Sequence, residues 1–198
     1  MTKEDIQALL TAEANAVKSL PITEDYQTAI KLIVTHVNEK GGKLVCSGMG
    51  KAGQIAMNIS TTFSSTGTPS VYLHPAEAQH GDLGLLQPND LLLLVSNSGK
   101  TREIIELVQL THGLYPDMPY ILITGNQQGE LVQDAAATLL TGNPPEVCPL
   151  GMAPTTSTTM MTVIGDILIV GTERAIGFTK EQYALRHHGG YLGQKSRQ

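Results

Sequence analysis

The chain has 198 residues, of which 41% are hydrophobic and 16% are charged, and its formal net charge is −5. This length favours one compact domain with a full core, so we treat residues 1–198 as a single domain. The acidic balance disfavours a nucleic-acid partner, which requires basic patches.

Cysteine content and hydropathy bear on the cellular setting. Cys46 and Cys148 are the two cysteines of the chain, and so sparse a set is typical of a reducing, cytosolic protein. Glu4 and Asp5 stand where a signal peptide would be basic, and no run approaches about 18 apolar residues. We therefore predict a cytoplasmic protein that is neither exported nor bound to a membrane.

Hydrophobic periodicity predicts two helices within residues 1–40, interrupted at Pro21, and an α/β core with a C-terminal helix and tail over 43–198. An irregular segment, His74–Pro88, and a polar tail from Arg186 complete the pattern. Five strands that alternate with helices predict an α/β fold with a doubly wound, flavodoxin-like parallel sheet. The predicted strands are Lys43–Ser47, Ser70–Leu73, Asp90–Val95, Tyr120–Thr124 and Ala137–Leu140. The predicted helices of the core and tail are Gln54–Ser65, Arg102–Leu114, Gln128–Ala135, Thr155–Gly177 and Lys180–Leu185.

Two glycine-rich loops, Gly48–Gly53 and Ser96–Thr101, each follow a predicted strand and precede a predicted helix. Such a turn directs backbone N–H groups and the positive end of the helix dipole at one place, which suits an anion. These loops also carry four hydroxyl groups, which could simply cap helices or form turns. Together they favour a terminal phosphate monoester as the ligand. The residues are Ser47 on the first loop and Ser96, Ser98 and Thr101 on the second.

Two nucleotide-binding patterns fit these loops incompletely. The Gly48–Gly53 loop matches G-x-G-x-x-G, but the next strand ends in Tyr72–His74, where a dinucleotide site has an acid about 20 residues further on. Gly99–Thr101 matches the end of a P-loop, but Leu94 stands where its first glycine would fall. We therefore disfavour dinucleotide binding and NTP hydrolysis.

Six segments resemble, in order and at similar spacings, the sugar-isomerase (SIS) domain of the arabinose-5-phosphate isomerases: GMGKAG, SSTGTPS, HPAEAQHGDLG, SNSGKTREI, EVCPLGMAPTTSTT and LRHHGGYLG. The resemblance covers nearly the whole chain. It implies interconversion of D-ribulose 5-phosphate and D-arabinose 5-phosphate, the entry step to Kdo, the eight-carbon sugar acid of lipopolysaccharide and some capsules. Longer relatives append a pair of regulatory CBS modules, which we expect this chain, ending at Gln198, to lack.

The resemblance also implies roles for individual residues. Substrate contacts are implied at Gly67, Thr68, His74 and His80, and His74 is in addition where a divalent metal can bind and inhibit. In the tail, His187 and His188 follow Arg186 where relatives have Ser-His-Pro, so the position of the functional histidine is open between the two. Catalytic roles are implied for Lys51, Glu103, Glu146 and His187.

An aldose–ketose isomerisation moves a proton between C1 and C2 through an enediol, and it needs an acid–base group near each carbon. Our hypothesis is that Glu146 or His187 moves the proton and that Lys51 stabilises the developing oxyanion. Glu103 would orient Lys51 or a substrate hydroxyl. Simpler interpretations exist, because Glu103 can complement a helix dipole and the side chains of Lys51 and Glu146 can simply be solvated.

Two other functions stay open: a non-catalytic SIS sensor of a sugar phosphate, and an isomerase of a six- or seven-carbon sugar phosphate, since the loops recognise the phosphate end that such substrates share. The proton-transfer groups favour an enzyme over a sensor. The histidines lack the spacing of a zinc site, so we expect no cofactor and no required metal. The apolar N-terminal helices and the reactive tail predict sites completed across subunits, and the resemblance implies a homotetramer.

Overall fold

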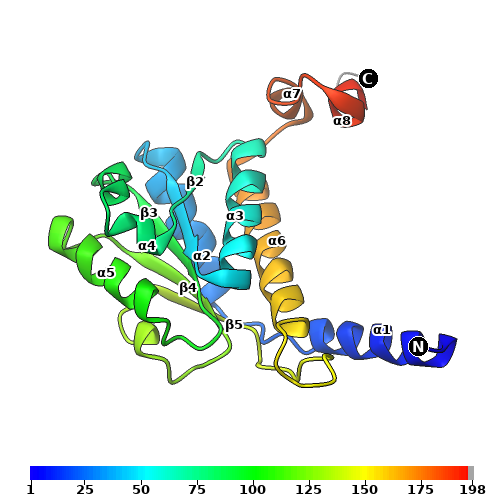
Figure 1. Ribbon diagram of the computed structural model, residues 1–198. Helices are drawn as coiled ribbons and strands as arrows, with labels where there is room; N and C mark the ends of the chain where they lie inside the picture. Colours follow the sequence, from blue (N-terminus) through cyan, green and yellow to red (C-terminus); the bar gives the residue numbers. More distant parts are fainter. Residues whose placement is uncertain (196–198) are drawn as a thin grey trace.

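Five parallel strands form one sheet between two layers of helices in the computed structural model, which describes residues 1–195 (Figure 1). The strands are β1 (Leu44–Gly48), β2 (Ser70–Tyr72), β3 (Leu91–Val95), β4 (Tyr120–Thr124) and β5 (Ala137–Leu140). They lie in the order β2-β1-β3-β4-β5, and each neighbouring pair is parallel. The predicted doubly wound α/β fold is confirmed. In such sheets ligands bind at the carboxyl ends of the strands, where the strand order reverses, here between β1 and β3.

Helices cover both faces of the sheet because successive strand residues point to opposite sides. Cys46 and Leu93 belong to a core shared with α2, α3 and α6, whereas Val45 and Leu92 pack with α4 and α5 on the other face. The helices are α1 (Lys3–Lys18), α2 (Asp25–Ile33), α3 (Gly50–Ser65), α4 (Pro75–Ala78), α5 (Arg102–Leu114), α6 (Thr156–Ile176), α7 (Lys180–Ala184) and α8 (Gly190–Lys195).

The glycines of the first loop allow the backbones of β1 and α3 to pack closely. A Cβ atom on Gly53 would lie 2.5 Å from the carbonyl oxygen of Gly48, and Gly50 has a φ of +58°. Tyr72 donates a hydrogen bond to the same carbonyl at 2.9 Å. The spacing of the glycines therefore has a structural cause, and α3 starts at Gly50, four residues before the predicted Gln54.

A few segments differ from the predicted elements. The helix predicted for Gln128–Ala135 is only a 3-10 turn, Glu130–Val132, because its backbone packs against the loop that follows β3. The segment predicted as irregular, His74–Pro88, contains α4 and a 3-10 turn, Asp82–Leu85. Helix α2 continues into a π-helical turn, Val34–Glu39, and the polar tail includes α8.

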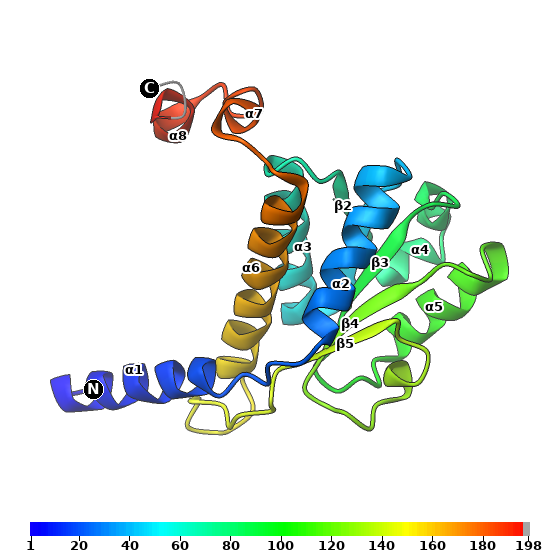
Figure 2. The same ribbon diagram turned by 180° about the vertical axis from the view of Figure 1, so that it is seen from behind.

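Two arms extend from the body of the molecule (Figures 1 and 2). Helix α1 is one of them: Ala16 is its single buried residue, while Ile6 and Leu10 are 48% and 58% exposed. Helices α7 and α8 form the other, beyond the end of α6, whose 21 residues span about 30 Å. Within the described residues no helix is both long and apolar enough to cross a membrane.

Candidate active site

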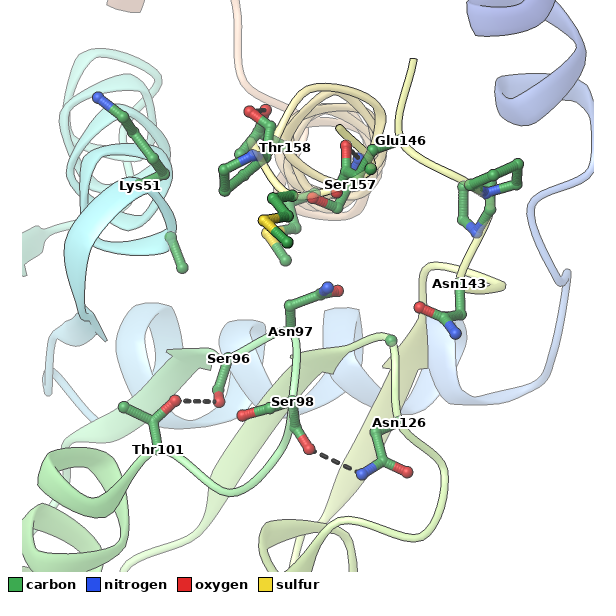
Figure 3. A pocket seen from close by; sticks show the side chains of 18 of the residues that line it. Lys51, Ser96, Asn97, Ser98, Thr101, Asn126, Asn143, Glu146, Ser157 and Thr158 are labelled. Atoms are coloured by element: carbon green, nitrogen blue, oxygen red, sulfur yellow. Dashed lines mark hydrogen bonds between the residues drawn. The ribbon is translucent and has the colours of Figure 1, made fainter. Parts of the chain in front are cut away.

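A cavity of about 720 Å³ lies at the carboxyl edge of the sheet, between α3 and α6 (Figure 3). The loops after β3, β4 and β5 contribute to its lining together with the first turns of the two helices. The structure thus brings together side chains that are far apart in the sequence. Five of the twelve predicted site residues line it: Lys51, Ser96, Ser98, Thr101 and Glu146.

The loop after β3 is anchored by hydrogen bonds that its backbone carbonyl groups accept from the segment after β4. Donors on the turn that follows β4 bind three successive carbonyls of the loop, while the amides of Asn97 and Ser98 donate to no group within the described residues. Because the carbonyls are engaged, the loop offers N–H groups to an anion. The three bonds run from Gly125 N to Asn97 O (3.0 Å), from Asn126 Nδ2 to Ser98 O (2.8 Å) and from Leu131 N to Gly99 O (3.4 Å).

The hydroxyl groups of this loop do not serve as helix caps. Thr101 is the N-cap of α5 but makes no side-chain cap bond; instead its Oγ1 lies 2.8 Å from Ser96 Oγ. Ser98 Oγ accepts a hydrogen bond from the backbone N–H of Lys100 at 3.2 Å. The first N–H groups of α5 are therefore left without a protein cap, as a phosphate-binding loop requires.

Glu146 is fixed at the start of α6. Its Oε2 accepts hydrogen bonds from Thr155 N (2.7 Å), Thr155 Oγ1 (2.8 Å) and Ser157 N (3.3 Å). Desolvation raises the pKa of this carboxyl, but the hydrogen bonds from Ser157 and Thr155 outweigh it and hold the pKa below its ordinary value of 4.5. Glu146 is thus a carboxylate at neutral pH.

Lys51 lies on the first turn of α3, across the cavity from Glu146 (Figure 3). Its side chain is exposed. A cation on one wall and a carboxylate on the other suit a reaction in which a proton is removed and a negative oxygen develops.

Three asparagines that sequence reasoning missed also line the cavity: Asn97, Asn126 and Asn143. The amide oxygens of Asn97 and Asn143 converge on Gly125, where an added Cβ atom would lie 2.6 Å from the first and 3.3 Å from the second. Asn143 adopts a left-handed backbone with φ of +50°. All three asparagines follow strands closely, which is the one sequence signal that could have identified them. Amide groups can donate to and accept from sugar hydroxyls.

Several predicted substrate contacts lie elsewhere in the fold. Ser47 is fully buried and its Oγ donates to Leu73 O at 2.7 Å, so its hydroxyl is engaged within the fold and does not line the cavity. Thr68 is 1% exposed. A Cβ atom on Gly67 would lie 2.6 Å from the Phe178 ring, so this glycine allows the C-terminal arm to approach.

The histidines and Glu103 are also outside the cavity lining. His74 is at the N-cap position of α4 but makes no side-chain cap bond, and its Nδ1 is buried without a hydrogen-bond partner in the described part of the chain. His80 is exposed. Glu103 is half-buried on the first turn of α5. No group of three or more His, Cys, Asp or Glu side chains within residues 1–195 is arranged to hold a metal ion.

His187 lies on the C-terminal arm, at the end of α6 opposite to the cavity (Figure 1). Its ring stacks on Tyr183 with 3.7 Å between centroids, and its Nδ1 lies 3.0 Å from Tyr183 O. The neighbouring His188 is exposed. Within one chain, therefore, neither histidine reaches the cavity that holds Glu146.

These features define an α/β protein with a loop of N–H groups and hydroxyls at the carboxyl edge of its sheet, facing a carboxylate and a lysine. The chain belongs to the SIS domain family, whose model matches residues 37–171.

The comparisons with individual proteins agree with this assignment. The chain is 47% identical over 154 residues to the arabinose 5-phosphate isomerase KdsD of Escherichia coli strain K12, which covers 78% of this chain and 46% of the relative. It is 41% identical over 191 residues to the KdsD of Pseudomonas aeruginosa, covering 96% and 57%. The chain thus spans about half the length of the curated relatives that it matches.

Solved structures resemble the chain over nearly its full length. A protein assigned as a phosphosugar isomerase involved in capsule formation, from Bacteroides fragilis NCTC 9343, is 64% identical, with a TM-score of 0.94 and coverage of 95% of this chain and 98% of that one. A protein of E. coli CFT073, solved in complex with arabinose 5-phosphate, is 30% identical, with a TM-score of 0.84 and coverage of 94% and 100%.

Proposed function

We propose that this protein is an aldose–ketose isomerase that interconverts D-ribulose 5-phosphate and D-arabinose 5-phosphate. The observation that carries the proposal is the cavity in which the Ser96–Thr101 loop meets Glu146 and Lys51. The names of the KdsD relatives support this choice of substrate, and so does the arabinose 5-phosphate complex of the 30% identical protein.

The proposed mechanism follows from the positions of the charged groups. The N–H groups and hydroxyls of the Ser96–Thr101 loop bind the phosphate, which places the other end of the open-chain sugar toward α6 and α3. Glu146 removes a proton from C1 of the ketose and returns it to C2, while the hydroxyl proton of O1 passes to O2; Lys51 stabilises the negative oxygen of the enediolate. The reaction is redox-neutral within the substrate, so we propose that no cofactor is required.

The second part of the proposal is that the protein works as a homotetramer in which His187 reaches the cavity of a neighbouring copy. Helix α6 separates the arm of His187 from its own cavity by about 30 Å. The exposed apolar side chains of α1 and of the outer face of α6, including Ile6, Leu10 and Val170, favour burial against another copy. The roles of Glu103, His74 and His80 stay predictions, to be tested by substitution in the same assembled protein.

An assay of the purified chain with D-ribulose 5-phosphate, followed by NMR, tests the activity. We expect conversion to D-arabinose 5-phosphate and a loss of about 10²–10⁴ in kcat for Glu146→Gln, whereas the matched control Glu39→Gln, at an exposed position, should leave kcat unchanged. Tight binding of the sugar phosphates without conversion would refute the enzyme and favour a sensor. Conversion of only a six- or seven-carbon sugar phosphate would correct the substrate.

Subunit complementation tests the shared site. Glu146→Gln and His187→Ala should each be inactive alone, but random mixed tetramers should recover about a quarter of wild-type activity, because that fraction of sites combines an intact cavity with an intact arm. Light scattering should give the mass of a tetramer. A fully active monomer would contradict the shared site, and an inactive His188→Ala beside an active His187→Ala would move the role by one residue.

The cellular context is also a proposal. The unpaired thiols of Cys46 and Cys148 support a reducing, cytoplasmic setting. There the product would supply the synthesis of Kdo for lipopolysaccharide or capsule.

A further inference from the structure

We infer that Glu13, on the N-terminal helix α1, is a positioning residue for Glu146. It makes a hydrogen bond to a buried threonine at the start of α6, and the same end of α6 holds the Glu146 carboxylate. This inference rests on the proposed function only in giving Glu146 a catalytic role; the coupling between the two glutamates follows from the structure alone.

Three consecutive residues connect the two carboxylates. Thr155 and Ser157 donate to Glu146 Oε2, whereas Thr156, which lies between them, donates from Oγ1 to Glu13 Oε1 at 2.9 Å. The first turn of α6 is therefore bound by one carboxylate facing the cavity and by another belonging to α1.

A second connection runs through the backbone next to Glu146. The Oγ1 atom of Thr156 accepts a hydrogen bond from Val147 N at 3.1 Å, and Thr156 is 1% exposed. Glu13 consequently orients the hydroxyl that holds the peptide immediately after Glu146. Without Glu13, the buried Thr156 hydroxyl would lack its acceptor. Both the peptide after Glu146 and the first turn of α6, whose groups bind the Glu146 carboxylate, could then shift.

Stability alone does not explain a glutamate at position 13. Glu13 Oε2 is buried and has no hydrogen-bond partner within the described residues. A buried carboxylate oxygen without a partner is unfavourable, so an apolar residue of similar size would serve packing better. Apart from this contact, α1 lies largely outside the body of the molecule (Figures 1 and 2). Glu13 is the residue of α1 that makes a side-chain hydrogen bond to the start of α6.

The test compares Glu13→Leu, which removes the acceptor at similar volume, with Glu13→Gln, which keeps it. We expect Glu13→Leu to lower kcat about 10- to 100-fold, as a misplaced catalytic group does. Inhibition by inorganic phosphate should be unchanged, because the proposed phosphate-binding loop, Ser96–Thr101, follows β3 and is not held by α1. Glu13→Gln should retain activity, and so should the matched control Gln7→Ala, an exposed position on the same helix.

A readout independent of turnover separates this inference from the proposed function. Titration of Glu146 by ¹³C NMR should show its pKa rising toward the ordinary value in Glu13→Leu but not in Glu13→Gln, and this holds even if the wild type isomerises no sugar phosphate. If Glu13→Leu does not fold, Thr156→Val breaks the same contact from the other side and should give the same rise. An unmoved Glu146 titration in the folded variant, or a kcat within about twofold of wild type, would overturn the inference.

Discussion

Replacing Gly129 by alanine should displace the phosphate loop without changing any side chain that lines the cavity. A Cβ atom there would lie 2.8 Å from Gly99 Cα and 2.9 Å from Gly99 O, so the two backbones must separate by a few tenths of an ångström. The φ of Gly129 is −66°, which alanine adopts without strain. Overpacking of this kind costs about 1–3 kcal/mol of unfolding free energy. A weakened hydrogen bond to a charged phosphate costs about 1.5–3 kcal/mol of binding free energy, which is about 10- to 100-fold in affinity.

The assay is inhibition of the isomerase by inorganic phosphate, together with urea unfolding. Gly41→Ala is the matched control, because Gly41 has a φ of +72° and no atom within 4 Å of an added Cβ; it should lose about 1–2 kcal/mol of stability from left-handed strain and keep its phosphate affinity. Gly99→Ala, with a φ of +61° and a contact of 3.1 Å to Gly129 Cα, should lose both. A Gly129→Ala protein that binds phosphate within about twofold of wild type would refute the reasoning.

Three further outcomes follow from contacts outside the loop. Lys43→Met should destabilise the protein by about 3–5 kcal/mol in urea unfolding, because Lys43 Nζ lies 2.6 Å from Asp90, whose carboxylate is 1% exposed. Tyr72→Phe removes the bond to Gly48 O and should cost about 1 kcal/mol, seen as a lower urea midpoint with unchanged phosphate affinity. The folded-state pKa of Glu146 is lowered, so its carboxylate stabilises the fold above the unfolded pKa and ceases to do so as the pH falls through the folded one. The stability difference between wild type and Glu146→Gln should therefore shrink on acidification below about pH 4.5, and a difference that grows would contradict the assignment.

The sheet was predictable because its signals are local. Each strand is an apolar run of a few residues bounded by turn residues, and Leu91–Val95 is buried throughout, as a central parallel strand must be. The hydroxyls that line the cavity from this side were predictable for a similar reason, since they cluster within Ser96–Thr101. The turn at Glu130–Val132 was not predictable. A short 3-10 turn stands in place of the expected helix because Gly129 packs against the backbone of Gly99 in the Ser96–Thr101 loop.

The rest of the candidate site depends on contacts between distant segments, which no local pattern encodes. Ser47 follows an apolar run just as the serines of the second loop do, but its hydroxyl donates to Leu73 O at the end of the neighbouring strand. Glu13 looks like an ordinary charged residue on an amphipathic helix, yet it meets Thr156 across 143 positions of chain. The same logic applies to His187, whose arm lies a full helix length from its own cavity. In the proposed homotetramer His187 acts only on the cavity of a neighbouring copy, so the loss of turnover in His187→Ala would report on assembly as light scattering does.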